Sequence, residues 1–330
     1  MNLAWVLASL LPALVAWIVI AWLRGSRAAT VLSDVPNERS LHAAATPRVG
    51  GLGLLAGALP VAALLGGAPI LVMVACAALL AVISTADDRR SLPIAVRLPA
   101  HIAAAAVAIL AIASPDAARG ALGIVESMLA LVAIVWMANL YNFMDGSDGI
   151  AGGMTLIGFG ALALAAALAR QWPLALACMA IASASAGFLA HNFPPARVFM
   201  GDAGSVPLGF LAGALGLHGV LTGAWPLALP LIVFSPFIAD ATATLARRVV
   251  RGEPFWKAHR THHYQRLVLS GWSARRLAFG AYALMLVAAA TALATRAADA
   301  RMQLAIIAGW AVVYAVIFFA ITRRNAASAT

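Results

Sequence analysis

The stretch VWMANLYNFMDGSDGIAGGMTLIGFG, residues 135–160, places two carboxylates and two carboxamides between two long apolar runs. The apolar pattern begins near residue 121 and resumes after the polar residues as far as residue 169. Runs of roughly 17 to 23 apolar residues are long enough to cross about 30 Å of hydrocarbon as helices. The stretch therefore predicts two transmembrane helices joined by a polar turn at one membrane surface.

The composition of the whole chain is typical of a membrane protein. Hydrophobic residues make up 63% of its 330 residues and charged residues 10%, against roughly 45–50% and about 25% in soluble domains. The pattern predicts an all-α, polytopic membrane protein with ten or eleven transmembrane helices, forming one domain over residues 1–330. The expected spans are 3–23, 50–67, 69–85, 98–114, 121–139, 150–169, 173–191, 205–222, 225–246, 275–295 and 302–321.

The basic residues predict how these spans are oriented. No basic residue precedes the first span, and Arg24 and Arg27 follow it, which is the reverse of a cleavable signal peptide. Of the 22 Lys and Arg residues, one set of alternating loops holds only Arg119, Arg170, Arg296 and Arg301. Basic loops remain cytoplasmic, so we expect the other set to face the cytoplasm and the N-terminus to lie outside. This bias accounts for most of the +10 net charge, and no nucleic-acid partner is needed to explain it.

Adjacent carboxylates end the third expected span. Asp87 and Asp88 repel each other, and at the end of an apolar helix they need a cation or a proton nearby. Simple ion pairs with Arg89 and Arg90 would satisfy that need. A site for a bound cation would satisfy it equally well, and these four residues alone leave the choice open.

Two further acidic motifs map to the same side of the membrane. Asp145 and Asp148 are three residues apart, so on a helix they would share a face with about 5–6 Å between their Cβ atoms. Mg²⁺ is commonly held by one or two carboxylates together with waters and phosphate oxygens. In GDAGS, Gly201 and Gly204 flank Asp202, and exposed backbone N–H groups there could cradle a phosphate. A solvated, glycine-rich helix start is the alternative for both motifs.

Histidines are concentrated in a basic segment, AHRTHHYQRL, residues 258–267. Zinc usually takes four Cys or His ligands, and no cysteine lies near this segment. Imidazole and guanidinium groups both donate hydrogen bonds to phosphate oxygens. The segment therefore favours a polyanion site, and a basic loop with incidental histidines is the alternative.

Taken in order, these motifs resemble a known family. DDRRSLP, NLYNFMDGSDGIAGG, NFPPARVFMGDAGSVPLG and AHRTHHYQRL are similar to motifs of the polyprenyl-phosphate N-acetylhexosamine-1-phosphate transferase superfamily. An upstream segment, residues 34–53, also resembles the first inner loop of that family. The resemblance extends over about residues 34–267 and rests on several ordered motifs expected on one membrane face.

The resemblance implies a Mg²⁺-dependent reaction at the cytoplasmic face of a bacterial inner membrane, with Mn²⁺ as an alternative ion. The phosphate of a polyprenyl lipid, usually undecaprenyl phosphate, would attack the β-phosphorus of a UDP-N-acetylhexosamine and release UMP. Phosphoryl transfer needs positioning and charge neutralisation more than covalent chemistry, which agrees with a site of carboxylates and cations. A covalent aspartyl intermediate is the rival scheme.

The resemblance also implies roles for individual residues. The metal ligands would come from Asp202, Asp87, Asp88 and Asp148, with Asp202 leading, and the catalytic residues would be Asp87, Asp88 and Asp202. One aspartate of the adjacent pair would orient or deprotonate the lipid phosphate. The expected substrate-binding residues are Asn142, Asp145, Asp148, His259, Arg260, His262, His263, Arg48 and Asn192.

Departures from the family pattern narrow the expected branch. Peptidoglycan enzymes of the family resemble a pattern with a lysine where this chain has Ser91 and with three consecutive histidines where it has HRTHH. The chain looks more like enzymes that initiate O-antigen or other surface polysaccharides, with UDP-GlcNAc, UDP-QuiNAc or UDP-FucNAc as donor. A muramoyl-pentapeptide transferase and a membrane transporter are the alternatives. A homodimer is compatible with the sequence, which does not specify the oligomeric state.

Overall fold

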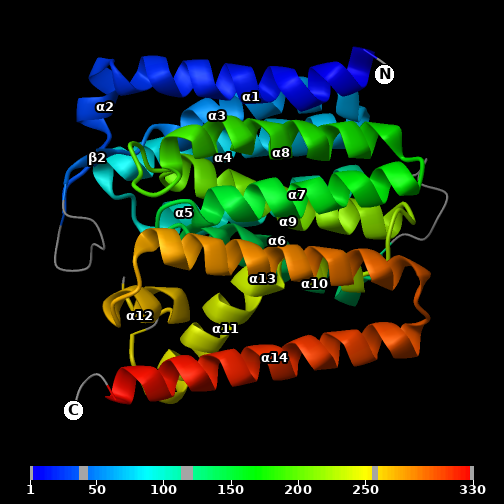
Figure 1. The fold of residues 1–330 in the computed structure, drawn as a ribbon. Helices are drawn as coiled ribbons and strands as arrows, with labels where there is room; N and C mark the ends of the chain where they lie inside the picture. Colours follow the sequence, from blue (N-terminus) through cyan, green and yellow to red (C-terminus); the bar gives the residue numbers. More distant parts are fainter. Residues whose placement is uncertain (1–2, 37–43, 113–121, 255–258, 328–330) are drawn as a thin grey trace.

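The computed structural model describes residues 3–36, 44–112, 122–254 and 259–327, and Figure 1 shows a bundle of roughly parallel and antiparallel helices. Part of the expected first inner loop, residues 34–53, falls outside the described residues. The elements are α1 (Leu3–Arg24), α2 (Arg27–Val31), β1 (Ser33–Asp34), β2 (Thr46–Pro47), α3 (Gly50–Gly66), α4 (Ala68–Arg90), α5 (Ile94–Ile112), α6 (Ile124–Phe143), α7 (Ile150–Leu168), α8 (Trp172–Asn192), α9 (Asp202–Leu221), α10 (Ala228–Val233), α11 (Ser235–Val250), α12 (His263–Leu269), α13 (Ala274–Ala294), the 3₁₀ turn η1 (Thr295–Ala297) and α14 (Ala300–Ala327).

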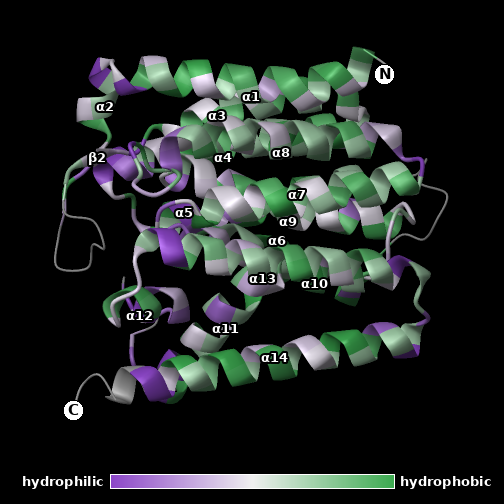
Figure 2. Cartoon of the chain, viewed as in Figure 1, coloured by the Kyte–Doolittle hydropathy of each residue, from purple (hydrophilic) through white to green (hydrophobic). Residues whose placement is uncertain are grey.

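The helices confirm the prediction of an all-α, polytopic membrane protein. Within the described residues, nine helices are long and apolar enough to cross a membrane, and the apolar helix α3 is shorter. Helices suit this environment because they satisfy their backbone hydrogen bonds internally, where lipid offers no partner. Hydrophobic residues cover the helix shafts, and hydrophilic residues gather at the helix ends (Figure 2).

The expected span 225–246 is wrong as a continuous helix. The chain forms α10, and α11 begins at Ser235 after a break at Phe234. Pro236 lies in the first turn of α11 and has no N–H to offer the carbonyl of Ile232 four residues earlier. The hydroxyl of Ser235 donates to that carbonyl instead, at 2.7 Å. Figure 1 shows α11 running obliquely between α13 and α14.

Close helix contacts depend on glycines at the end of the bundle that holds the polar motifs. A Cβ built on Gly51 of α3 would collide with the backbone of Gly204 in α9, and the converse holds as well. A Cβ on Gly209 would similarly collide with the backbone of Met137 in α6. Small residues let transmembrane backbones approach closely and pack by van der Waals contact. These contacts fix the start of α9, which carries Asp202, between α3 and α6.

The loops that carry the polar motifs lie together at one end of the bundle. In Figure 1, α2, β2 and α12 share the end at which α14 finishes, and α1 begins at the opposite end. Successive helices alternate in direction, so the ends of α4, α6 and α8 and the start of α9 meet there. Segments far apart in the sequence are thereby brought to one surface.

Candidate active site

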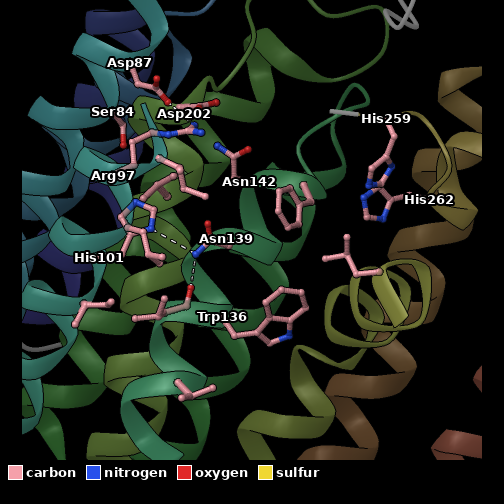
Figure 3. Close-up of a pocket in the computed structure, with 18 of the residues that line it drawn as sticks. Ser84, Asp87, Arg97, His101, Trp136, Asn139, Asn142, Asp202, His259 and His262 are labelled. Carbon is pink, nitrogen blue, oxygen red and sulfur yellow. Dashed lines mark hydrogen bonds and ion pairs between the residues drawn. The ribbon is translucent and has the colours of Figure 1, made fainter. Parts of the chain in front are cut away.

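A cavity of about 620 Å³ opens at this end of the bundle, between α5, α6, α9, α11 and the histidine segment. Figure 3 shows Asp87, Arg97, Asn142 and Asp202 at one end of it, with His259 and His262 on the opposite wall. Apolar side chains of α5 and α6 line much of the rest: Ile94, Leu98, Ile102, Leu131, Val132 and Val135. We call this cavity the groove.

The apolar part of the groove lies on helices that expose hydrophobic surface. Ile94 of α5 and Val132 of α6 are 60% and 65% exposed. Ile94, Leu98 and Ile102 recur every four residues, so they form one stripe along α5 that is about 12 Å long. Because exposed apolar surface on these spans faces hydrocarbon, the groove joins a polar pocket to the lipid phase.

Asp87 is held by local contacts at the end of α4. Its side chain accepts a hydrogen bond from the backbone N–H of Leu92 at 2.6 Å and forms an ion pair with Arg97 at 2.7 Å. Arg97 belongs to α5, so this pair joins α4 to α5. Pairing with Arg89 or Arg90 was the simplest expectation, but both arginines are exposed and a more distant arginine takes the role.

Asp88 points toward the start of α9. Its carboxylate accepts the backbone N–H groups of Asp202 at 3.4 Å and Ala203 at 3.2 Å, and its side chain is 1% exposed. Carboxylates are favoured at a helix N-terminus, where the first N–H groups have no partner within the helix. The expected phosphate cradle of GDAGS is therefore already occupied by a carboxylate of the chain itself.

Arg48 is the cation nearest to Asp88. Arg48 directly follows β2. One of its guanidinium nitrogens lies 3.4 Å from Asp88, and another lies 2.6 Å from Asp34, the last residue of β1. Burial alone would lower the pKa of Arg48, but the carboxylates of Asp34 and Asp88 outweigh burial and raise it. One arginine is thus shared by two carboxylates.

Asp145 and Asp202 complete a group of carboxylates with too few cations. No ion pair involves either residue within the part of the chain described. Asp202 interacts with the side chain of Asn142. Burial of its carboxyl group, together with Asp202 and Asp88, raises the pKa of Asp145 well above its usual range. We call Asp88, Asp145 and Asp202 the carboxylate cluster.

The carboxylate cluster suits a hard divalent cation. Carboxylate oxygens are the ligands that Mg²⁺ prefers, and a second positive charge would offset the shortage of cations. Among the described residues, no three His, Cys, Asp or Glu side chains converge into a ready-made metal cage. Mg²⁺ needs no such cage, because substrate phosphates and waters commonly complete its coordination. Asp88, Asp145 and Asp202 are the residues that could hold it.

The expectation that Asp145 and Asp148 share a helix face is wrong. The chain turns between Phe143 and Ile150, and Gly149 adopts a φ of 77°, which favours glycine. The carboxylate of Asp148 accepts the backbone N–H of Ala196 at 2.9 Å. It thereby fastens the turn after α6 to the loop after α8, whereas Asp145 lies in the carboxylate cluster.

Asn192 connects the same two loops. Its side-chain oxygen accepts the N–H of Gly149, and its amide donates to the carbonyl of Val198, each at 2.9 Å. The residue is buried, with both ends of its side chain committed. Asn192 thus joins the two loops, and its expected role in binding substrate stays a prediction.

The histidines divide into two groups. His259 and His262 line the groove with their rings stacked at 5.0 Å between centroids. His263 instead stacks on Phe318 of α14 at 3.8 Å and is buried. Arg260 is exposed. Two of the four expected phosphate-binding residues in this segment therefore reach the cavity.

His259 is poised to donate a hydrogen bond into the groove. Burial, His262 and two nearby arginines lower the pKa of His259 to about 4, so its imidazole is neutral at pH 7. The backbone N–H of Thr261 donates to its Nδ1 at 3.4 Å, which leaves the ring proton on Nε2. A neutral imidazole of this tautomer can donate to a phosphate oxygen.

Several polar groups near the site were not selected from the sequence. Arg97 pairs with Asp87, and His101 of α5 lies 3.4 Å from the side-chain nitrogen of Asn139 within the groove. Asp240 of α11 contacts the histidine segment. His101 and Asp240 lie inside apolar runs, where a polar residue is itself a signal of function, and Arg97 lies at the edge of one.

Comparisons with known proteins agree with these motifs. The profile of Glycosyl transferase family 4 matches residues 70–220. The chain is 27% identical over 287 residues to the probable undecaprenyl-phosphate N-acetylglucosaminyl 1-phosphate transferase of Bacillus subtilis (strain 168), over 83% of this chain and 80% of that protein. It is 30% identical over 286 residues to the undecaprenyl-phosphate alpha-N-acetylglucosaminyl 1-phosphate transferase of Yersinia pestis, over 78% of this chain and 74% of that protein.

A second group of relatives matches a shorter part of the chain. The phospho-N-acetylmuramoyl-pentapeptide-transferase of Lactiplantibacillus plantarum is 31% identical over 188 residues, which is 56% of this chain and 57% of that protein. The profile match includes the carboxylate cluster and ends before the histidine segment.

Proposed function

The chain belongs to the polyprenyl-phosphate N-acetylhexosamine-1-phosphate transferase superfamily, and on that premise we propose that it transfers an N-acetylhexosamine 1-phosphate from a UDP-sugar to undecaprenyl phosphate. The products are UMP and a lipid-linked diphospho-sugar. The observation that carries this proposal is the groove, which has buried carboxylates at one end and an apolar wall open to lipid along its length. One substrate is soluble and the other greasy, and this groove offers each a fitting surface.

The reaction proceeds on the cytoplasmic side of a bacterial inner membrane. The loop bias of basic residues supports this orientation, and the carboxylate cluster lies at the bundle end expected to be cytoplasmic. A UDP-sugar enters from that side. The isoprenoid tail lies along the stripe of Ile94, Leu98 and Ile102, which brings the lipid phosphate to the polar end of the groove.

Asp88 is better suited than Asp87 to orient or deprotonate the lipid phosphate. Asp87 is held tightly, by the N–H of Leu92 at 2.6 Å and by Arg97 at 2.7 Å. The contacts of Asp88 with Arg48 and with the N–H groups at the start of α9 are longer, at 3.2 to 3.4 Å. Arg48 and Arg97 lie close enough to attract the two anionic substrates. Electrostatic stabilisation by groups already in place is usually the largest contribution to such a step.

His259 and His262 donate to the donor's phosphates from the opposite wall, and Asn142 orients Asp202. Mg²⁺, or Mn²⁺ in its place, would be held by Asp88, Asp145 and Asp202. When bound, it would neutralise charge on the diphosphate and on the leaving UMP. Asn142, Asp202, His259 and His262 line the groove, and Asp88 and Asp145 lie beside Asp202.

UDP-GlcNAc or a 6-deoxy relative is the proposed donor. Relatives named as N-acetylglucosaminyl 1-phosphate transferases match more of the chain than the named muramoyl-pentapeptide transferase does, which supports this choice. Ser91 in place of the lysine of the peptidoglycan pattern supports it too. Initiation of O-antigen or another surface polysaccharide is the role proposed for the product.

The test is an assay of the purified protein in detergent with undecaprenyl phosphate and Mg²⁺. UMP release is followed with UDP-GlcNAc, UDP-QuiNAc, UDP-FucNAc and UDP-MurNAc-pentapeptide, beside a related enzyme of known activity. We expect release with at least one of the first three sugars and none with the pentapeptide. Release with the pentapeptide alone would assign the chain to the peptidoglycan branch, and release with no donor would refute the transferase.

A further inference from the structure

We propose that Asp240 of α11 is a positioning residue, which holds the histidine segment against the groove and so sets the affinity for the UDP-sugar. The proposal rests on the proposed function above. Asp240 does not line the groove. It acts through the histidine segment, whose His259 and His262 line the groove.

Asp240 receives hydrogen bonds from several directions. Its carboxylate accepts the backbone N–H groups of His263 at 2.8 Å and Tyr264 at 3.0 Å. The hydroxyl of Thr244 donates to it at 3.1 Å, and the Nδ1 atoms of His263 and His262 lie at 3.2 and 3.5 Å. The residue is 5% exposed.

These contacts satisfy the carboxylate. Four of the five contacts fall on Oδ1, and the N–H of Tyr264 falls on Oδ2. A buried charge is tolerated when it is hydrogen-bonded in this way. Both oxygens of Asp240 therefore have donors from the surrounding chain, which suits the residue to holding structure in place.

The start of α12 is also fastened to the turn that follows α6. The hydroxyl of Tyr264 donates to the carbonyl of Phe143 at 3.0 Å. A Cβ built on Gly146 would collide with that hydroxyl, so glycine is needed for this contact. Asp240 therefore fixes a tyrosine that reaches the residues beside Asn142 and Asp145.

The position of His262 follows from these contacts. Its ring stacks on Phe143 at 6.1 Å, on Tyr264 at 5.9 Å and on His259 at 5.0 Å, each between ring centroids. Two of these three partners are themselves held by Asp240 or by the tyrosine that it fixes. Without the carboxylate, His259 and His262 would lose their fixed direction into the groove.

The kinetic test uses Asp240→Asn, with Glu253→Gln as the matched control. Glu253 follows the same helix and pairs with Arg248 at 2.8 Å, with its side chain 38% exposed. In the asparagine variant one carboxylate oxygen becomes an NH₂ group, which cannot accept the N–H that Tyr264 now donates to Asp240. We expect the KM for the accepted UDP-sugar to rise at least about tenfold, with kcat within about threefold and the KM for undecaprenyl phosphate unchanged. Glu253→Gln should leave both KM values as they are.

A merely structural role would give another pattern, because loss of folded protein lowers the apparent kcat and leaves each KM in place. That pattern would overturn the proposal, as would an equal rise of both KM values. Asp240→Glu keeps the charge and should restore part of the affinity for the UDP-sugar. A glutamate variant no better than the asparagine variant would also count against the proposal.

A second measurement needs neither turnover nor a variant. Hydrogen–deuterium exchange of the wild-type protein in detergent reports on the amides of His263 and Tyr264. We expect both to exchange at least about tenfold more slowly than the amide of Arg260. Exchange of all three at the same rate would overturn the positioning role even if UMP release is normal, and slow exchange with no UMP release would leave it standing while refuting the transferase.

Discussion

Two groups of aspartates lie at the same end of the helix bundle and differ in how their charge is balanced. Among the described residues, the only ion pair of the carboxylate cluster of Asp88, Asp145 and Asp202 is the one with Arg48, which Asp34 shares. Asp240, by contrast, is surrounded by donors of its own neighbourhood. A carboxylate that lacks cations can recruit a metal ion and substrates, whereas a satisfied carboxylate can only hold structure in place.

On this contrast we base the proposal that one group of aspartates is catalytic and that Asp240 is a positioning residue. The aspartates of both groups are at least partly buried, so burial alone does not distinguish them. The supply of hydrogen-bond donors and cations does distinguish them, because it decides whether the charge still needs a partner. Variants of each group should therefore fail in different ways.

Loss of a carboxylate from the cluster should have the largest effect. We expect Asp88→Asn and Asp202→Asn each to lower kcat by about a hundredfold or more, because charge that acts on the transferring phosphate is removed. Each variant should still insert into the membrane. Glu126→Gln, at the other end of α6, is the control and should keep the wild-type rate. UMP release measures all three, and a near-normal rate for Asp202→Asn would refute its role.

Removal of the Asn192 side chain should cost stability. Asn192→Ala leaves the N–H of Gly149 and the carbonyl of Val198 buried without their partner, and such groups cost about 1–3 kcal/mol each. We expect a lower thermal midpoint in detergent, with the KM values close to those of the wild type at low temperature. A rise in KM without loss of stability would instead support the expected substrate-binding role of Asn192.

Separation of Asp87 from Arg97 should have a smaller effect on the rate. Arg97→Gln leaves a buried carboxylate without its ion pair and frees the start of α5 from the end of α4. We expect about a tenfold fall in kcat/KM, measured by UMP release. Arg97→Lys keeps the charge and should fall less. A variant with no change would show that Asp87 needs no arginine.

The smallest effect that we expect is a pH dependence of stability caused by the carboxylate cluster. The pKa of Asp145 in the folded protein lies above its unfolded value. The folded state therefore binds more protons than the unfolded state above about pH 4, and its stability falls as pH rises toward the folded pKa. With EDTA present, we expect the thermal midpoint to drop by a few degrees between pH 5 and pH 8.

Mg²⁺ should remove much of that pH dependence, because it replaces the protons in the carboxylate cluster. Asp145→Asn should flatten the same profile without the ion. The measurement is a series of melting curves in detergent, with and without Mg²⁺. A wild-type midpoint that is independent of pH in EDTA would contradict a shortage of cations at the cluster.

The sequence predicted the helices well because lipid leaves the chain few alternatives. An apolar run of sufficient length forms a helix, and α7 (Ile150–Leu168) begins at the expected residue and ends within one residue of it. The broken span at α10 and α11 was missed because the run 225–246 is predominantly apolar, and the break depends on Pro236 and on a hydroxyl that replaces its missing N–H.

The site was predicted less completely than the fold. The order of the motifs predicted that Asp88, Asp145 and Asp202 lie at one surface, because alternating helices return every second loop to the same side. It did not show that Asp87 pairs with Arg97, or that Asp148 bonds to the Ala196 backbone, because such contacts depend on side-chain directions across helices. Asp240 stands out as a charged residue in an apolar run, but its position in the sequence alone does not connect it to the histidine segment.

The distinction between the two groups of aspartates is tested most sharply by Mn²⁺ binding, measured by electron paramagnetic resonance on the purified protein without nucleotide. Three forms are compared: the wild type, Asp202→Asn and Asp240→Asn. We predict that the wild type and Asp240→Asn bind Mn²⁺ alike, and that Asp202→Asn binds it at least about tenfold more weakly. Equal binding by Asp202→Asn and the wild type, or equal loss in both variants, would contradict the distinction between the carboxylate cluster and Asp240.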